Sequence, residues 1–287
     1  MALTVLMEHK DNPHTGKGFF LNRLHEAFRH IGVSVVTDPR KSHDIYLAFN
    51  SFKFITKKPK ILRLNGCYHN TRMKGMLSAN AEIRSQVKRA DGVVYQSEFC
   101  RKMHEKYIGL HDNHTVIFNG APIMKPEKTM PYVLVAARMR PHKRLDEARV
   151  AAEIAQVPIV ICAGKIPRDE VDDYMRKASA LVHLSWIDWN PNSVVEALAS
   201  GCPVITNNVG GTQELIKDGC GKILDVDAPY NMKPVDLYHP PKIDLNIVAQ
   251  AIRESLDWPR VTNNSHVDII NVARQYADFI NSCLGAR

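Results

Sequence analysis

The residues between Ser185 and Ile205 combine an acidic loop with a helix start, an arrangement suited to phosphate chemistry. The pattern predicts a strand end, a loop that contains Asp188, a helix that begins at Asn192 or Ser193, and a glycine stop before a new strand. The first N–H groups of a helix have no acceptor inside the helix, and the helix dipole is positive at this end. The segment therefore predicts a binding site for an anion such as a phosphate group.

Glu196 lies one turn into this predicted helix, where its carboxylate can accept hydrogen bonds from ribose hydroxyls. The hydroxyl of Ser193 can touch a phosphate oxygen or cap the helix. Ser193 and Glu196 also match the Ser-x-x-Glu spacing of a capping box, in which the two side chains only satisfy the helix start. The spacing alone leaves both interpretations open.

Two cations, Arg138 and Lys143, follow the strand expected at residues 132–136. The carboxyl ends of parallel strands are where α/β sheets bind ligands. Cations five residues apart on such a loop can clamp a diphosphate and neutralise a leaving group. The alternative is a basic loop that faces solvent and binds nothing.

Two glycine-containing loops allow a ligand or a backbone to come close. Gly16 and Gly18 follow the first expected strand, but no third glycine completes a dinucleotide fingerprint and no Gly-Lys-Ser/Thr forms a P-loop. We expect this loop to admit something anionic. Gly210 and Gly211 precede a predicted helix in the same way, and an ordinary turn is the alternative.

The sequence lacks the residue patterns that several other kinds of active site require. Asp225-Val226-Asp227 has the D-x-D form of metal-dependent transferases, but no further carboxylates cluster nearby in the sequence. The 13 histidines show no H-x₃-H or HExxH spacing, so no zinc site is predicted. No G-x-S-x-G elbow indicates an α/β-hydrolase. We therefore expect neither a metal nor a cofactor.

Short β-branched runs alternate with segments of helical period, which predicts parallel α/β sheets. The predicted strands span residues 3–7, 33–36, 45–49, 61–64, 93–96, 116–118, 132–136, 158–162, 181–184 and 204–206. The predicted helices span residues 18–31, 73–89, 98–107, 145–155, 169–177, 193–199, 212–217, 245–256 and 267–284. Residues 121–128 are rich in proline and charge, so we expect domains of residues 1–125 and 126–266.

The composition is that of a globular protein, with 45% hydrophobic and 24% charged residues in a chain of 287. No apolar run approaches the roughly 20 residues of a membrane-spanning helix. The amino terminus reads as a strand and not as a secretory signal. The six cysteines are scattered singly, which favours reduced thiols and a cytoplasmic location.

The positive charge is concentrated in the first half. Residues 1–125 carry 20 of the 38 Lys and Arg residues but only 10 of the 30 Asp and Glu residues. This imbalance favours an anionic partner, such as a phosphate-bearing substrate, a membrane surface or nucleic acid, although a solvated surface is the alternative. Nucleic acid is the less favoured partner, because few aromatic residues interleave the basic ones. Salt-dependent sedimentation with anionic liposomes or DNA separates these partners.

Several motifs in collinear order resemble the GT-B glycosyltransferases of family 4, the group 1 glycosyl transferases. The glycine loop of that family corresponds to Gly16 and Gly18. The other matched motifs are Ala90-Asp91-Gly92-Val93 with Ser97-Glu98-Phe99, Val116-Ile117-Phe118-Asn119-Gly120, Ala137-Arg138 to Lys143, Gly164-Lys165, and Asp188 with Glu196 at the E-x7-E spacing. The resemblance is strongest from residue 133 to residue 221.

The resemblance implies a role for each matched residue. Arg138 and Lys143 would hold the diphosphate, and the backbone near Ser193 and Val194 would meet it as well. Glu196 would bind the donor ribose, and Asp188 would contact the transferred sugar. Gly164-Lys165 would lie near the nucleobase.

Two departures from the family pattern concern the sugar. Asp188 stands where the family has glutamate, so its carboxylate is one methylene shorter. The family often has a histidine after its fourth strand, and either Asn65 or His69 can fill that place in an acceptor or sugar pocket. The chain is also short for the family.

The resemblance implies a GT-B architecture in which two Rossmann-like domains face a central cleft. Residues 1–125 would bind the acceptor, with the final helix of 267–287 packing back on them, and residues 126–266 would bind the nucleotide-sugar donor. The implied reaction is metal-independent sugar transfer, with retained anomeric configuration, to a glycan, lipid-linked or other acceptor. A nucleotide-sugar epimerase of the same fold and a non-catalytic nucleotide-sugar-binding protein are the alternatives.

Overall fold

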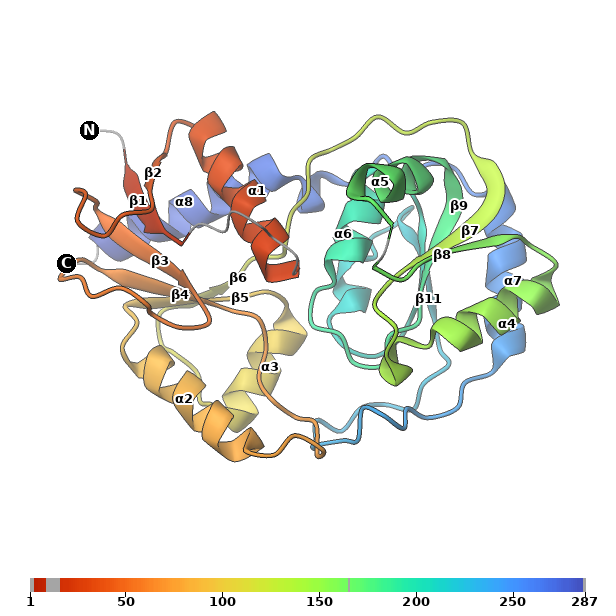
Figure 1. The fold of residues 1–287 in the computed structure, drawn as a ribbon, viewed down its shortest axis with the longest axis horizontal. Coiled ribbons are helices and arrows are strands. Elements are labelled where there is room, and N and C mark those ends of the chain that lie inside the picture. Colours follow the sequence, from red (N-terminus) through yellow and green to blue (C-terminus); the bar gives the residue numbers. More distant parts are fainter. Residues whose placement is uncertain (1–2, 9–15, 165, 286–287) are drawn as a thin grey trace. The chain divides into compact units, whose positions relative to one another are not determined.

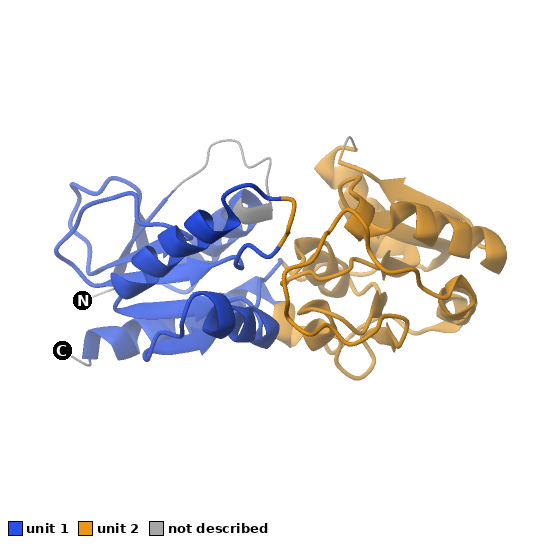
Figure 2. Cartoon of the chain, turned by 90° about the horizontal axis from the view of Figure 1, so that it is seen from below, with its two compact units in different colours: residues 1–69, 73–121, 268–287 blue, residues 70–72, 122–267 orange. Residues whose placement is uncertain are grey.

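A computed structural model describes residues 3–8, 16–164 and 166–285. The chain forms two compact units, each with its own parallel sheet (Figures 1 and 2). Unit 1 comprises residues 1–69, 73–121 and 268–287, and unit 2 comprises residues 70–72 and 122–267. The prediction of an α/β chain with two parallel-sheet domains is confirmed.

The sheet of unit 1 has six strands in the order β2-β1-β3-β4-β5-β6, and every pairing is parallel. Its strands are β1 (Thr4–Met7), β2 (Ser34–Val36), β3 (Ile45–Phe49), β4 (Lys60–Leu64), β5 (Gly92–Tyr95) and β6 (His114–Val116). All five residues of β3 are buried, as expected for a central parallel strand that is covered on both faces.

Helices α1 (Gly16–His30) and α8 (Ile269–Gly285) pack together on one face of this sheet. Phe20, Leu24 and Phe28 recur every four residues along α1, so they form one apolar stripe. The rings of Phe20 and Phe28 both contact the ring of Tyr276 in α8. Helices α2 (Met76–Lys88) and α3 (Glu98–Tyr107) cover the other face (Figure 1).

The sheet of unit 2 has five parallel strands in the order β11-β10-β9-β7-β8. These strands are β7 (Met130–Ala136), β8 (Ile159–Cys162), β9 (Ala178–His183), β10 (Val204–Asn207) and β11 (Gly221–Leu224). Helices α4 (Leu145–Ala155) and α7 (Leu245–Glu254) bury alanine-rich stripes on one face. Helices α5 (Arg168–Lys177) and α6 (Asn192–Ala199) lie on the other (Figure 1).

Three local predictions differ from the structure. Gly16 and Gly18 both lie in the first turn of α1, which begins two residues before the expected helix of residues 18–31. The strand expected at residues 116–118 is β6, which ends at Val116, although the N–H of Ile117 still donates to the carbonyl of Tyr95 at 2.9 Å. The helix expected at residues 212–217 is only a 3₁₀ turn, Thr212–Leu215, after which Ile216 is extended.

Part of the basic surface of unit 1 has partners inside the protein. Lys53 forms an ion pair with Glu8 at 2.8 Å. Arg84 donates hydrogen bonds to the carbonyls of Tyr107 and Ile108 at the end of α3, where cations are favourable. Contact with an anionic membrane stays a prediction. Among the described residues, no helix has both the length and the hydropathy that crossing a membrane requires.

Candidate functional site

The carboxyl edge of the unit 2 sheet brings together three predicted segments. Arg138 and Lys143 follow β7, Asp188 follows β9, and Gly210 follows β10. Because β7, β9 and β10 are parallel neighbours, their carboxyl ends meet at the same edge. Segments far apart in the sequence are therefore adjacent in unit 2.

Lys143 and Asp188 are in direct contact at this edge. Nζ of Lys143 lies 2.5 Å from Oδ2 of Asp188, although 45 residues separate them. Lys143 ends the 3₁₀ helix η1 (Pro141–Lys143), which the fixed φ of Pro141 starts. Oδ1 of Asp188 accepts a hydrogen bond from the backbone N–H of Trp189 at 2.8 Å. The structure thus joins two of the predicted catalytic residues.

Charge stabilises the Asp188 carboxylate against the effect of its burial. Burial opposes ionisation, but the charge of Lys143 and the contact with His183 outweigh it and hold the pKa of Asp188 below its ordinary value. Nε2 of His183 lies 3.4 Å from Oδ2 of Asp188. Burial lowers the pKa of His183, so its imidazole is neutral near pH 7. Sequence reasoning did not identify His183, which ends β9.

Backbone contacts fix the loop that carries Asp188. The N–H of Trp186 donates to the carbonyl of His142, and the N–H of Gly211 donates to the carbonyl of Asp188, each at 2.7 Å. Ile187 has a φ of 61°, which is rare for a β-branched residue. A Cβ on Gly210 would lie 2.6 Å from the Asp188 carbonyl oxygen. The lack of a side chain at Gly210 therefore makes room for the protein's own loop that carries Asp188.

The start of α6 excludes the capping-box interpretation. Pro191, and not Ser193, is the N-cap residue, and its carbonyl accepts hydrogen bonds from the N–H groups of Val194 and Val195. Asn192 and Ser193 are the first two helical residues, at the positive end of the helix dipole. The N–H of Val194 is therefore hydrogen-bonded within the first turn of the helix. Ser193 precedes Val194, at the start of the helix.

Glu196 is buried in the second turn of α6 and pairs with Arg168. Nη1 of Arg168 lies 2.7 Å from Oε2 of Glu196, and Nη2 lies 2.6 Å from Asp172. Burial opposes the charge of Arg168, but these carboxylates outweigh it and raise its pKa. Sequence reasoning missed Arg168, because its partner lies 28 residues away and no local spacing signals the contact.

The other predicted donor residues have less defined surroundings. Arg138 is exposed just beyond the end of β7. Lys165 lies outside the described residues, and Gly164 before it is exposed, with a φ of 86°. Gly16 and Gly18 belong to unit 1.

Asn65 and His69, the predicted acceptor or sugar pocket, follow β4 in unit 1. The N–H of Asn65 donates to Oδ1 of Asn50 at 2.8 Å, and its carbonyl accepts a hydrogen bond from Gln96. His69 is buried, which lowers the pKa of its imidazole. Both residues lie just beyond the carboxyl end of a central strand.

The D-x-D sequence has a structural role. Both carboxylate oxygens of Asp227 accept hydrogen bonds from the guanidinium of Arg144, each at 2.7 Å. Asp225 binds the side chain of Asn208 at 2.6 Å. Within residues 3–8, 16–164 and 166–285, no group of three or more His, Cys, Asp or Glu side chains is arranged to hold a metal ion.

One protein family resembles part of this chain in sequence, and solved structures resemble it in fold. Residues 106–232 match the family of glycosyl transferases group 1, a segment that includes Lys143, Asp188 and Glu196. No curated protein sequence matches the chain.

Solved glycosyltransferase structures share the fold over the whole chain. AviGT4, a glycosyltransferase involved in avilamycin A biosynthesis, is 12% identical, with a TM-score of 0.67 over 99% of each chain. HepE from Anabaena, in complex with UDP and glucose, is 14% identical, with a TM-score of 0.68 over 98% of this chain and 100% of that one. Sucrose-phosphate synthase from Thermosynechococcus elongatus is 13% identical, with a TM-score of 0.69 over 100% of both. The fold is that of the GT-B glycosyltransferases.

Replacing Gly210 by alanine tests the close approach of the Asp188 loop. Gly210 and Gly219 both have a positive φ, of 87° and 78°, but a Cβ on Gly219 would meet nothing within 4 Å. Gly210→Ala should therefore lower the free energy of unfolding by about 1–3 kcal/mol more than Gly219→Ala, because it adds a clash to the same backbone strain. Urea denaturation measures both, and equal losses would contradict the packing described.

The lowered pKa of Asp188 predicts how stability depends on pH. A carboxyl whose pKa is depressed on folding stabilises the protein above its unfolded pKa of about 4, and that contribution is lost as the pH falls through the folded value. The stability advantage of the wild type over Asp188→Asn should therefore shrink below about pH 4. Urea denaturation between about pH 6 and pH 3 checks this, and a constant difference would refute it.

Proposed function

We propose that this chain is a retaining glycosyltransferase that moves a sugar from a nucleotide-diphosphate-sugar donor to an acceptor hydroxyl without a metal. The observation that carries the proposal is the meeting of Lys143, Asp188 and the start of α6 at one sheet edge of unit 2. The match to glycosyl transferases group 1 over residues 106–232 supports it. The UDP and glucose bound by HepE, a protein of the same fold, indicate the class of donor.

Lys143 can bind a donor phosphate while it keeps Asp188. An ammonium group has three N–H donors, and the contact with Oδ2 of Asp188 uses one of them. Arg138 and the positive end of α6 at Ser193 add further positive potential. We assign these groups to the diphosphate and Asp188 to the transferred sugar.

Glu196 is the residue that we assign to the donor ribose. Its carboxylate is buried, and Arg168 compensates the charge. Ribose hydroxyls are hydrogen-bond donors, so an ionised carboxylate is a fitting acceptor. Arg168 would act by orienting the carboxylate and offsetting its charge. We assign the segment Gly164-Lys165 to the nucleobase.

The chemistry follows from the charge that develops on the leaving group. The bond between the anomeric carbon and the phosphate oxygen breaks while the acceptor oxygen bonds to that carbon on the same face. The acceptor proton passes to the departing phosphate. Lys143, Arg138 and the helix N–H groups would stabilise the negative charge on the diphosphate, which is the task that a metal ion performs elsewhere.

A nucleotide titration tests the donor assignment. A thermal-shift series with UDP, GDP and ADP and their sugars should raise the Tm with one nucleotide, because a ligand at 100 times its Kd adds about 2.7 kcal/mol of stability. EDTA should leave the shift unchanged, and Glu196→Ala should abolish it. The matched control is Glu254→Ala, which removes another carboxylate of unit 2 that pairs with a lysine at the surface.

No shift with any nucleotide would contradict the donor site. With the nucleotide known, NMR of the product separates the enzyme classes. A transferred sugar with retained configuration supports the proposal, and an altered donor sugar without acceptor would indicate an epimerase.

For the acceptor we propose a glycan or lipid-linked molecule bound by unit 1 near Asn65 and His69, with contact to an anionic membrane. The loop between β3 and β4 supports this, because Ile55 is 98% exposed and the lysines Lys57 and Lys58 follow it. All six cysteines are buried and none forms a disulfide, which suits the reducing cytoplasm.

Anionic vesicles test the membrane contact. Ile55→Ser should weaken binding about tenfold, because burial of an isoleucine side chain is worth about 1.5–3 kcal/mol. The control Met139→Ser removes a side chain of unit 2 that is 73% exposed and should have no effect. Sedimentation at low and high salt measures both, and equal binding by all three proteins would exclude this loop.

A further inference from the structure

Arg144, the residue after Lys143, adopts a backbone conformation that is unusual for its size. Its φ of 53° and ψ of 43° lie in the left-handed region, where a long side chain is strained. Arg144 is both the C-cap residue of η1 and the N-cap residue of α4, so the chain changes direction at this residue. Something in the fold must hold it there.

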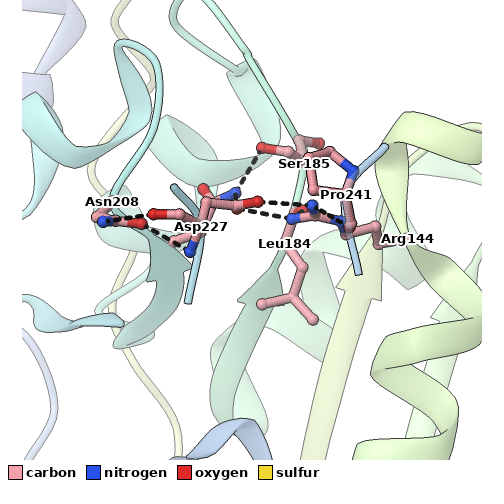
Figure 3. Close-up of polar contacts among 7 residues, drawn as sticks. Arg144, Leu184, Ser185, Asn208, Asp227 and Pro241 are labelled. Carbon is pink, nitrogen blue, oxygen red and sulfur yellow. Dashed lines mark hydrogen bonds and ion pairs between the residues drawn. The ribbon is translucent and has the colours of Figure 1, made fainter. Parts of the chain in front are cut away.

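The side chain of Arg144 supplies that restraint. It is fully buried, and its two terminal nitrogens donate to four acceptors. Two are the carboxylate oxygens of Asp227, each at 2.7 Å, and two are carbonyl oxygens, of Leu184 at 3.3 Å and of Pro241 at 2.8 Å. Figure 3 shows this arrangement. A bidentate pair of this kind has a fixed orientation.

Residues at the carboxyl end of β10, the strand next to β11, hold Asp227 in place by hydrogen bonds. The amide of Asn207 donates to Oδ2 of Asp227 at 2.7 Å and to the carbonyl of Ser185 at 3.1 Å. The side chain of Asn208 bonds both the N–H and the carbonyl of Asp227 (Figure 3). The network therefore connects the segments that follow β7, β9, β10 and β11.

Several of the residues that make these contacts lie close in sequence to residues of the candidate site. Arg144 is the residue after Lys143, and Leu184 and Ser185 start the loop that carries Asp188. A shift of the Arg144 guanidinium would move Lys143 and the Asp188 loop relative to each other.

We propose that the buried Arg144–Asp227 ion pair is a positioning device that holds Lys143 and the Asp188 loop in the register needed to bind the donor diphosphate. Neither residue touches the donor, so both are positioning residues. The inference rests on the donor site proposed above.

Calorimetric titration with UDP and UMP tests the pair, or with the corresponding GDP or ADP couple if the wild type prefers that base. Arg144→Gly removes the guanidinium and relieves the strain, and Asp227→Asn keeps the shape but removes the charge. Each should weaken binding of the diphosphate about tenfold and that of the monophosphate much less, because misplacement acts on the contact of Lys143 with the terminal phosphate.

The matched controls are Arg149→Ala and Glu153→Gln, which break an exposed ion pair on α4 and should leave both affinities unchanged. A purely structural role would lower the Tm of the variants but leave the UDP-to-UMP ratio of the wild type, and that result would overturn the inference. If Arg144→Gly does not fold, Asp227→Asn decides by the same ratio. A wild type that binds none of UDP, GDP and ADP would overturn the proposed function, and this inference with it.

Discussion

The ion pair between Arg144 and Asp227 removes two full charges from water, and the loops of unit 2 depend on how that loss is compensated. A buried pair offsets its desolvation only when its geometry is good and its remaining hydrogen-bonding groups are satisfied. Here Asn207 and two backbone carbonyls supply further hydrogen bonds to the pair, and only Nε of the Arg144 guanidinium has no partner among the described residues. The acceptors belong to separate loops, so the protein satisfies the buried charges only when those loops converge.

Unit 1 also buries an arginine near the carboxyl edge of its sheet, but compensates it differently. Arg63 is 1% exposed and donates to Gln96 at 3.0 Å and to Asn119, and it contacts no carboxylate among residues 3–8, 16–164 and 166–285. Its guanidinium lies over the rings of Phe20 and Phe49, at 4.9 and 5.7 Å. Amide oxygens and aromatic faces thus take the place that a carboxylate has beside Arg144, and burial lowers the pKa of Arg63.

Local patterns in the sequence predicted most of the elements, because parallel strands and amphipathic helices have strong periodicities. Spacing and family resemblance also singled out Lys143, Asp188 and Glu196. Such local patterns could not predict the contacts that these residues make. Arg168 and Asp227 meet partners 28 and 83 residues away, so only the topology of the sheet brings them together. The capping-box interpretation is wrong because Pro191 is the N-cap residue of α6, which makes Ser193 the second helical residue.

The connections between the two units determine which segment of the chain can be exchanged by recombination. Ala121 and Asp268 form a β-bridge in unit 1, and the N–H of Ile269 donates to the carbonyl of Ala121 at 3.0 Å. Segment 122–267 therefore leaves and re-enters unit 1 at neighbouring points, as an inserted domain does. Recombination at these two positions would exchange segment 122–267 as a single cassette, which is all of unit 2 except residues 70–72, and would leave the packing of α8 on its sheet intact.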